Sequence, residues 1–121
     1  LEEALGQFRC SSNSILAWLG PAIGPKAFEV GVSVYDAFCS QSSAASDCFV
    51  KQVNQTNSEG LGVIEKWHVD IYALAKLRLN SAGLSKIYGG DFCTYTDAQR
   101  FFSYRRDGKT GRMASCIWLS D

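Results

Sequence analysis

Short apolar runs that end at glycine or proline alternate along this chain with segments of helical periodicity. The runs Ile15–Leu19 and Lys86–Tyr88 stop at a Gly-Pro pair and a Gly-Gly pair, and continuously apolar runs of this length are typical of buried strands. Helical spacing predicts helices over residues 31–39 and 67–82. Because strands and helices mix without strict alternation, we predict an α+β fold with a mixed β-sheet and flanking helices.

The C-terminal part of the chain has the pattern of a β-hairpin. Residues 101–106 and 112–119 flank the five-residue connection Asp107–Gly111, which contains two glycines. Glycines supply the positive φ angles that such turns need. We therefore predict a hairpin here, and we expect Trp18 and Trp118 to lie in the core with the third tryptophan of the chain.

Length and charge narrow the classes of function. The 121 residues suit a single domain, and no stretch reaches the roughly 18 apolar residues that a membrane span requires. Twelve cations and twelve acids cancel, so we expect neither a nucleic-acid partner nor a membrane partner. The five cysteines show no metal-binding spacing. They are interpreted as reduced thiols of a cytoplasmic protein.

Residues Cys93 and Thr94 follow the Gly-Gly pair at the end of the second predicted strand. Loops at strand ends often carry functional residues, so both are candidates for substrate contact. A cysteine nucleophile assisted by His68, the only histidine, would make the protein a cysteine hydrolase. The alternatives are a buried, inert thiol and a partly exposed surface histidine.

A local excess of cations lies near the C-terminus. Between residues 100 and 112, five cations accompany Asp107 as the only acid. Arginine binds phosphates and carboxylates bidentately, which makes Arg105 and Arg106 candidates for an anion site. They could instead be exposed or paired within the fold, or could form a non-catalytic module that binds a nucleotide or an acidic partner.

Glu29 follows a Gly/Pro-rich loop in an apolar setting. A carboxylate in such a place is either paired or shifted in pKa, and the latter is how general acids and bases arise. Glu29 is therefore a catalytic candidate for proton transfer or for contact with a substrate. A salt bridge to an arginine of the predicted hairpin is the structural alternative.

Three segments together resemble one known family. They are residues 18–31 (Trp-Leu-Gly-Pro-Ala-Ile-Gly-Pro-Lys-Ala-Phe-Glu-Val-Gly), residues 70–75 (Asp-Ile-Tyr-Ala-Leu-Ala), and residues 88–95 continuing through 101–114. In order and over nearly the whole chain, they are similar to the C-terminal half of the YfiH-like laccase-domain family, also called peptidoglycan editing factors or polyphenol oxidase-like proteins.

The resemblance implies half of a single α+β domain about twice this length. Family members are linked to phosphorolysis of purine nucleosides such as inosine, adenosine and methylthioadenosine, to adenosine deamination, and to editing of cell-wall precursors. An older assignment as a laccase, or polyphenol oxidase, rests on copper chemistry.

The family's zinc or copper ligands are two histidines and a cysteine, which the resemblance places upstream of Leu1. No metal site is therefore expected in this chain, and Phe92 stands where many relatives have arginine. We expect the chain to be a C-terminal portion that supplies scaffold and pocket wall, and to be inactive alone. Because half a domain leaves apolar surface uncovered, we also expect a homodimer or contact with the missing N-terminal half.

Overall fold

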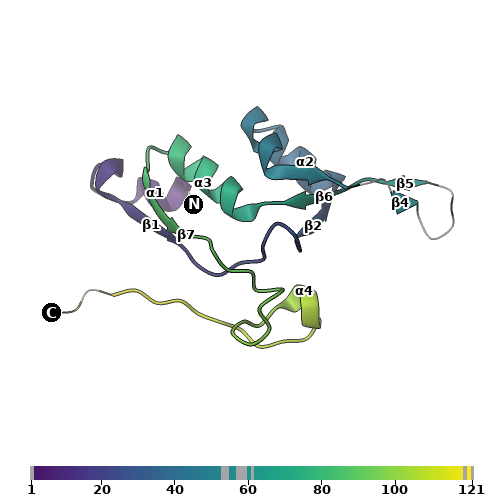
Figure 1. The fold of residues 1–121 in the computed structure, drawn as a ribbon. Helices are drawn as coiled ribbons and strands as arrows, with labels where there is room; N and C mark the ends of the chain where they lie inside the picture. Colours follow the sequence, from purple (N-terminus) through teal and green to yellow (C-terminus); the bar gives the residue numbers. More distant parts are fainter. Residues whose placement is uncertain (1, 53–54, 57–59, 61, 119, 121) are drawn as a thin grey trace.

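The computed structural model describes residues 2–52, 55–56, 60, 62–118 and 120. Helices and strands are mixed along this part of the chain (Figure 1), as the α+β prediction requires. The α-helices are α1 (Glu2–Gly6), α2 (Val32–Cys39), α3 (Ile71–Ser81) and α4 (Tyr104–Asp107). The strands are β1 (Leu16–Leu19), β2 (Glu29–Gly31), β3 (Phe49–Lys51), β4 (Gln55–Thr56), β5 (Val63–Ile64), β6 (Lys66–Val69) and β7 (Lys86–Gly89).

The main core lies on an antiparallel sheet in the order β2-β6-β3. Its buried residues include Trp67 and Val69, which alternate along β6 with half-buried positions, and Leu74 on α3. Tyr35 on α2 stacks on the Trp67 ring, with ring centroids 4.8 Å apart. Residues of helices α2 and α3 therefore pack on the face of this sheet that carries Trp67 and Val69.

A second, parallel sheet joins β1 to β7. Its two strands end at the loops that carry the Gly/Pro sequence and the Gly-Gly pair. Gly89 and Gly90 adopt φ angles of 79° and 91°, which glycine tolerates best. A side chain at Gly89 would also lie 2.4 Å from the carbonyl oxygen of Leu19. The Gly-Gly pair thus ends β7 as predicted and lets the two loops approach each other.

The hydroxyl of Tyr72, at the start of α3, ties these loops together. It accepts a hydrogen bond from the backbone N–H of Ala22 (2.6 Å) and donates one to the carbonyl of Phe92 (2.9 Å). Tyr72 is buried, and this burial raises the pKa of its phenol while the hydrogen bond from Ala22 opposes the rise. The helix therefore fixes the positions of both loops through one side chain.

The predicted helix over 67–82 is wrong in its first turn. Residues 67–69 belong to β6, and the helix begins only at Ile71. The side chain of Asp70 accepts a hydrogen bond from the N–H of Ala73, so Asp70 is the N-cap. Trp67 and Val69 have the period-two burial of a strand, which the helical interpretation of this segment overlooked.

The predicted C-terminal hairpin is also wrong within the described residues. Residues 104–107 form α4, whose N-cap Ser103 accepts a hydrogen bond from the N–H of Arg106, and Gly108 ends the helix with a φ of 68°. Residues 108–109 form a bend, and residues 110–118 form no strand ladder with any described residue. Leu119, the last residue of the predicted strand, lies outside the described residues.

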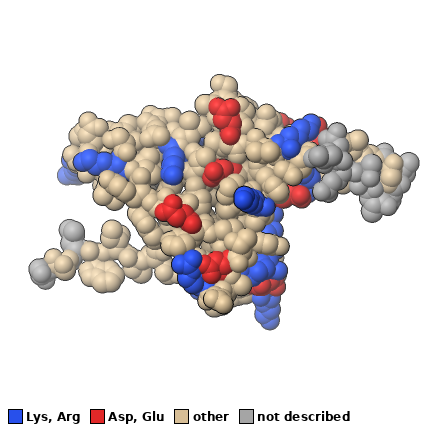
Figure 2. All heavy atoms as spheres, in the orientation of Figure 1, with Lys and Arg blue, Asp and Glu red and all other residues tan. Residues whose placement is uncertain are grey.

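Of the three tryptophans predicted to lie in the core, only Trp67 is buried. Trp18 is 54% exposed and Trp118 is 78% exposed. Strand β1 is thus a half-exposed strand rather than a buried one. Figure 2 shows that Lys and Arg side chains are interspersed with Asp and Glu over the visible face, and no described helix is long and apolar enough to cross a membrane.

Substitution of Tyr72 tests its place in the fold. Tyr72→Phe leaves the N–H of Ala22 and the carbonyl of Phe92 without their partner, so we expect the free energy of unfolding to fall by about 1–3 kcal/mol. Tyr104→Phe, at a residue that is 75% exposed, is the matched control and should change it by less than about 0.5 kcal/mol. Urea denaturation of both variants measures the difference, and equal small effects would contradict the bridging role.

Candidate functional site

A surface hollow of about 420 Å³ brings together side chains from three separate segments. Glu29 on β2 and His68 on β6 lie directly opposite each other in the antiparallel register. Arg105 of α4 and Lys26 of the Gly/Pro-rich loop line the same hollow, together with Thr96. The site therefore combines one carboxylate, one imidazole and two cationic side chains.

Glu29 is paired, but with a different partner from the one considered in the sequence. Its carboxylate lies 3.3 Å from the Nζ of Lys66, two residues before His68 on β6, and both side chains are about one-third exposed. An arginine does bind Glu29, through the backbone: Nη1 of Arg105 donates to the Glu29 carbonyl at 2.9 Å. The carboxylate thus keeps an exposed edge toward the hollow.

Arg105 lies on the exposed side of α4. Its guanidinium carbon is 5.3 Å from the centroid of the Phe28 ring, within the range of a cation–π contact. One Nη donates to Glu29, and the residue as a whole is exposed. Arg105 therefore retains N–H donors that an anionic ligand in the hollow could use.

Arg106 has a different environment. Its guanidinium donates to the carbonyls of Thr94, Tyr95 and Phe101 at 2.9–3.0 Å and to the carboxylate of Asp107 at 2.8 Å. The hydrogen-bonded Asp107 raises the pKa of Arg106, and Arg106 lowers the pKa of the Asp107 carboxyl. Since nearly all of its donors are used within the fold, Arg106 holds the loop of residues 94–101 against α4.

Cys93 and Thr94 lie where the two loops meet. The N–H of Thr94 donates to the carbonyl of Ala22 (2.9 Å), and the Sγ of Cys93 accepts from the N–H of Gly24 (3.1 Å). Burial raises the pKa of Cys93, but hydrogen bonds from the side chain and backbone of Thr96 and from other amides outweigh it, so the net pKa is lowered. Thr94 itself is buried.

The geometry does not pair Cys93 with His68. Among the described residues, Cys93 lines a hollow with Tyr72, whereas His68 lines the hollows beside Glu29 and β3. The Sγ atom is engaged by a backbone amide rather than by an imidazole. A cysteine–histidine pair for hydrolysis therefore finds no support in this arrangement.

The described residues also lack the ligand set of a metal centre. Within the described ranges, no three His, Cys, Asp or Glu side chains lie close enough to hold a metal ion. The five cysteines, all inside those ranges, are free thiols.

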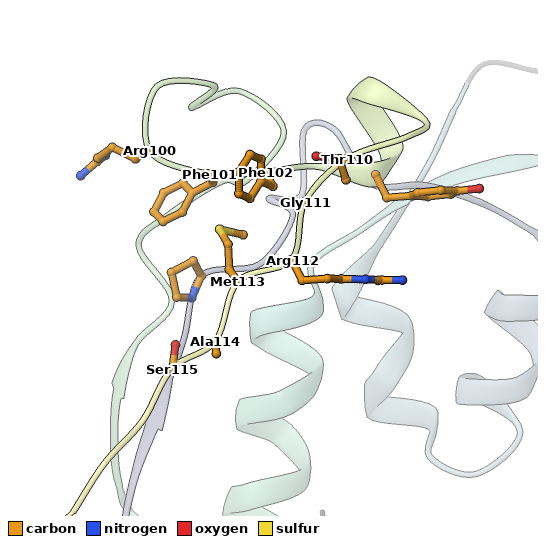
Figure 3. Close-up of a pocket in the computed structure, with 11 residues that line it drawn as sticks. Arg100, Phe101, Phe102, Thr110, Gly111, Arg112, Met113, Ala114 and Ser115 are labelled. Atoms are coloured by element: carbon orange, nitrogen blue, oxygen red, sulfur yellow. The ribbon is translucent and has the colours of Figure 1, made fainter.

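A second, larger hollow of about 530 Å³ lies between the loop of residues 100–104 and the extended segment 110–115 (Figure 3). The rings of Phe101 and Phe102 and the side chain of Met113 face its interior, whereas Arg100 points away. The Arg100 guanidinium lies 4.9 Å from the centroid of the Phe92 ring. The Phe92 ring thus contacts the cationic side chain of Arg100. The surface that lines the hollow is more apolar than polar.

This chain matches a known protein family over nearly its whole length. A family model described as multi-copper polyphenol oxidoreductase laccase matches residues 1–120. The chain belongs to this family. The match also agrees with the resemblance that the Gly/Pro-rich and Gly-Gly segments carry in the sequence.

Several relatives bear the name purine nucleoside phosphorylase. The chain is 50% identical over 119 residues to purine nucleoside phosphorylase YfiH of Escherichia coli, a match that covers 98% of this chain and 44% of that protein. It is 43% identical to a purine nucleoside phosphorylase of Pseudomonas aeruginosa, over all of this chain and 46% of the relative. The chain therefore spans less than half of the relatives it matches.

A solved structure shows the same partial coverage. The chain superposes on the Neisseria meningitidis protein NMB0706 with a TM-score of 0.75 and 38% identity, over 88% of this chain and 40% of that one. The α+β architecture is thus that of part of a YfiH-like domain.

Lys26, Lys66 and Thr96 were not among the candidates predicted from the sequence. Lys26 lies in the segment 18–31 that carries the family resemblance, but no role was predicted for it, and Lys66 lies just before the predicted helix. The pairing of β2 with β6 places Lys66 opposite Gly31, and its side chain reaches diagonally to Glu29. An alternating Lys-Trp-His-Val pattern was the one signal that could have revealed this strand.

The two adjacent arginines should differ in their effect on stability. Arg106→Gln removes hydrogen bonds to three backbone carbonyls and to Asp107, so we expect it to lower the urea midpoint of unfolding. Arg105→Gln removes one hydrogen bond and the contact with the Phe28 ring, both at an exposed residue, and should lower this midpoint less. Equal losses in urea denaturation would contradict the assignment of Arg106 as the structural member of the pair.

The pKa of the Cys93 thiol should lie below that of a cysteine in an unfolded chain. Since hydrogen bonds from Thr96 stabilise the thiolate, the alkylation rate of Cys93 should reach half its maximum at a lower pH in the folded protein than in the urea-unfolded chain. Thr96→Val should move this midpoint upward. Mass-spectrometric rates of iodoacetamide labelling at Cys93 between pH 6 and 10 measure it, and a midpoint unaffected by Thr96→Val would contradict the stated cause.

Proposed function

We propose that this chain supplies one wall of the active site of a purine nucleoside phosphorylase. The observation that carries the proposal is the hollow in which Glu29, His68, Lys26 and Arg105 meet. The phosphorylase names of relatives that are 43–50% identical to this chain support the reaction class.

Phosphorolysis has three chemical requirements. An oxygen of phosphate forms a bond to C1′ of the ribose while the bond from C1′ to the purine nitrogen breaks. The bonding electron pair leaves with the purine, which takes up a proton. A catalyst must therefore hold the phosphate dianion, stabilise the positive charge that develops on the ribose, and deliver a proton to the purine.

The side chains of the hollow match these requirements. Lys26 and Arg105 are the cationic groups that bind phosphate, since both line the hollow. Arg105 uses one Nη to bind the Glu29 carbonyl and retains further N–H donors for the anion. The carboxylate of Glu29 is the group for the developing positive charge or for the ribose hydroxyls. His68, opposite Glu29, is the nearest imidazole for proton delivery.

The other candidates have supporting roles in this proposal. Arg106 fixes the loop beside α4, and Thr94 and Cys93 fix the junction of the two loops. Zinc or copper, which the family resemblance implies, would be held by residues outside this chain. The chain by itself is therefore expected to be inactive.

A fused protein tests the proposal directly. The part of Escherichia coli YfiH that lies outside the match is joined to this chain in one polypeptide, and phosphorolysis of inosine and adenosine is followed by release of the purine base. We expect phosphate-dependent turnover from the fusion and none from the chain alone. Ammonia release without phosphate separates deamination from phosphorolysis.

Variants of the fused protein assign the roles. Glu29→Gln should lower kcat about 100-fold or more, and Arg105→Gln should raise the KM for phosphate about tenfold or more. Arg9→Gln, at an exposed arginine of the N-terminal region, is the matched control and should change neither. Full activity of both site variants would contradict the proposal, and nucleotide binding without turnover would favour a non-catalytic binding module.

A further inference from the structure

The face of the three-stranded sheet away from the core carries a row of three side chains. His68 on β6 lies opposite Glu29 on β2 and also opposite Val50 on β3. Residues that lie directly opposite each other in antiparallel strands share a face of the sheet. Trp67 and Val69, which flank His68 along β6, face the core instead. The row therefore runs from a carboxylate, through an imidazole, to an apolar side chain.

A hollow of about 350 Å³ lies at the apolar end of this row. Its lining includes Pro25, Cys48 and Val50, and more of the lining surface is apolar than polar. Burial raises the pKa of the Cys48 thiol, and the carboxylates of Asp70 and Asp47 raise it further, so this sulfur is uncharged at neutral pH. The hollow thus has the size and the apolar surface of a small-ligand pocket.

This hollow adjoins the one that contains Glu29 and Arg105. Lys26 and His68 line both hollows, so the two form one groove, polar at the Glu29 end and apolar at the Val50 end. A purine nucleoside with phosphate is divided in the same way. Its phosphate and ribose are polar, whereas its base is a flat ring that apolar side chains can cover.

An exposed carboxylate lies at the apolar hollow. Asp47 contributes to its lining, and no cation of the described residues forms an ion pair with it. Asp70 lines the hollow as well, but its carboxylate accepts the N–H of Ala73 as the cap of α3. Since a carboxylate accepts hydrogen bonds and donates none, Asp47 is suited to a ligand with N–H donors on its edge.

We propose that the hollow beside Val50 binds the base of a purine nucleoside and that Asp47 determines which purine is preferred. The inference rests on the proposed function, in which His68 delivers a proton to the leaving purine. His68 lies between the two hollows. A base in one hollow and a ribose in the other therefore place the bond that breaks next to this imidazole.

The hydrogen-bonding edge of the base gives the direction of the preference. Guanine has N–H donors at its ring nitrogen N1 and at its 2-amino group, and a carboxylate accepts from both. In adenine, N1 is itself an acceptor, so a carboxylate that faces it meets a lone pair. A site that binds a donor of the substrate discriminates against the analogue that lacks it. Asp47 therefore favours 6-oxopurine nucleosides over adenosine.

Exchange of the carboxylate for an amide tests the role of Asp47. In the fused protein, Asp47→Asn replaces one acceptor by an N–H donor that suits N1 of adenine. We expect the kcat/KM for guanosine, divided by that for adenosine, to fall about tenfold. Asp36→Asn, at an exposed aspartate of α2 outside the lining, is the matched control and should leave this ratio unchanged. An unchanged ratio in Asp47→Asn, or the same change in both variants, would overturn the assignment.

A charged side chain in the apolar hollow tests where the base lies. Val50 is 64% exposed, so Val50→Lys is compatible with folding. This variant should raise the KM for guanosine and for adenosine severalfold and leave the KM for phosphate unchanged, the reverse of Arg105→Gln. Val63→Lys, at a residue that is 60% exposed on β5, is the control and should change neither. Unchanged nucleoside KM values in Val50→Lys would overturn the placement.

Failure of the inference is distinguishable from failure of the proposed function. If Glu29→Gln and Arg105→Gln impair turnover but Asp47→Asn leaves the ratio unchanged, the function stands and the inference fails. If the fused protein turns over no purine nucleoside, the function fails, and calorimetric binding of guanosine and adenosine then tests the hollow. Guanosine binding that Asp47→Asn weakens would support the inference. No binding, or binding that Asp47→Asn leaves unchanged, would overturn it.

Discussion

The hydrogen bonds of one buried tyrosine determine where the functional groups of this chain lie. Through its hydroxyl, Tyr72 joins the loop that follows β1 to the loop that follows β7. The first loop leads to Lys26 and Glu29, and the second leads to Thr96 and α4. Arg106 then fixes the second loop against α4 through three backbone carbonyls. These two side chains therefore hold in place the loops whose residues line the hollow.

Much of the fold follows from local patterns. The strands near residues 15–19 and 86–88, the helix over 31–39 and the Gly-Gly stop were predicted because apolar runs and glycines act locally. The boundary at Asp70 was missed, since Trp67 and Val69 fit both a helical and an alternating pattern. The hairpin prediction was wrong because a strand needs a neighbouring strand. Residues 104–107 of the predicted partner form α4, and residues 112–118 pair with no described strand.

The site was predictable in part. Glu29 and Arg105 were chosen for their chemistry, and the structure brings both to one hollow. The difference between Arg105 and Arg106 could not be predicted, because it depends on which carbonyls each guanidinium reaches after folding. The exposed Trp18 and Trp118 show the same limit, because no local pattern distinguishes them from the buried Trp67.

The central claim is that Lys26, Glu29, His68 and Arg105 face the reacting substrate. A crystal structure of the fused protein with a purine nucleoside and sulfate in place of phosphate tests it most directly. The account predicts a sulfate oxygen within about 3 Å of the Arg105 guanidinium or the Lys26 amine, with the ribose beside Glu29. A nucleoside and sulfate bound at a place that none of these four side chains touches would contradict it.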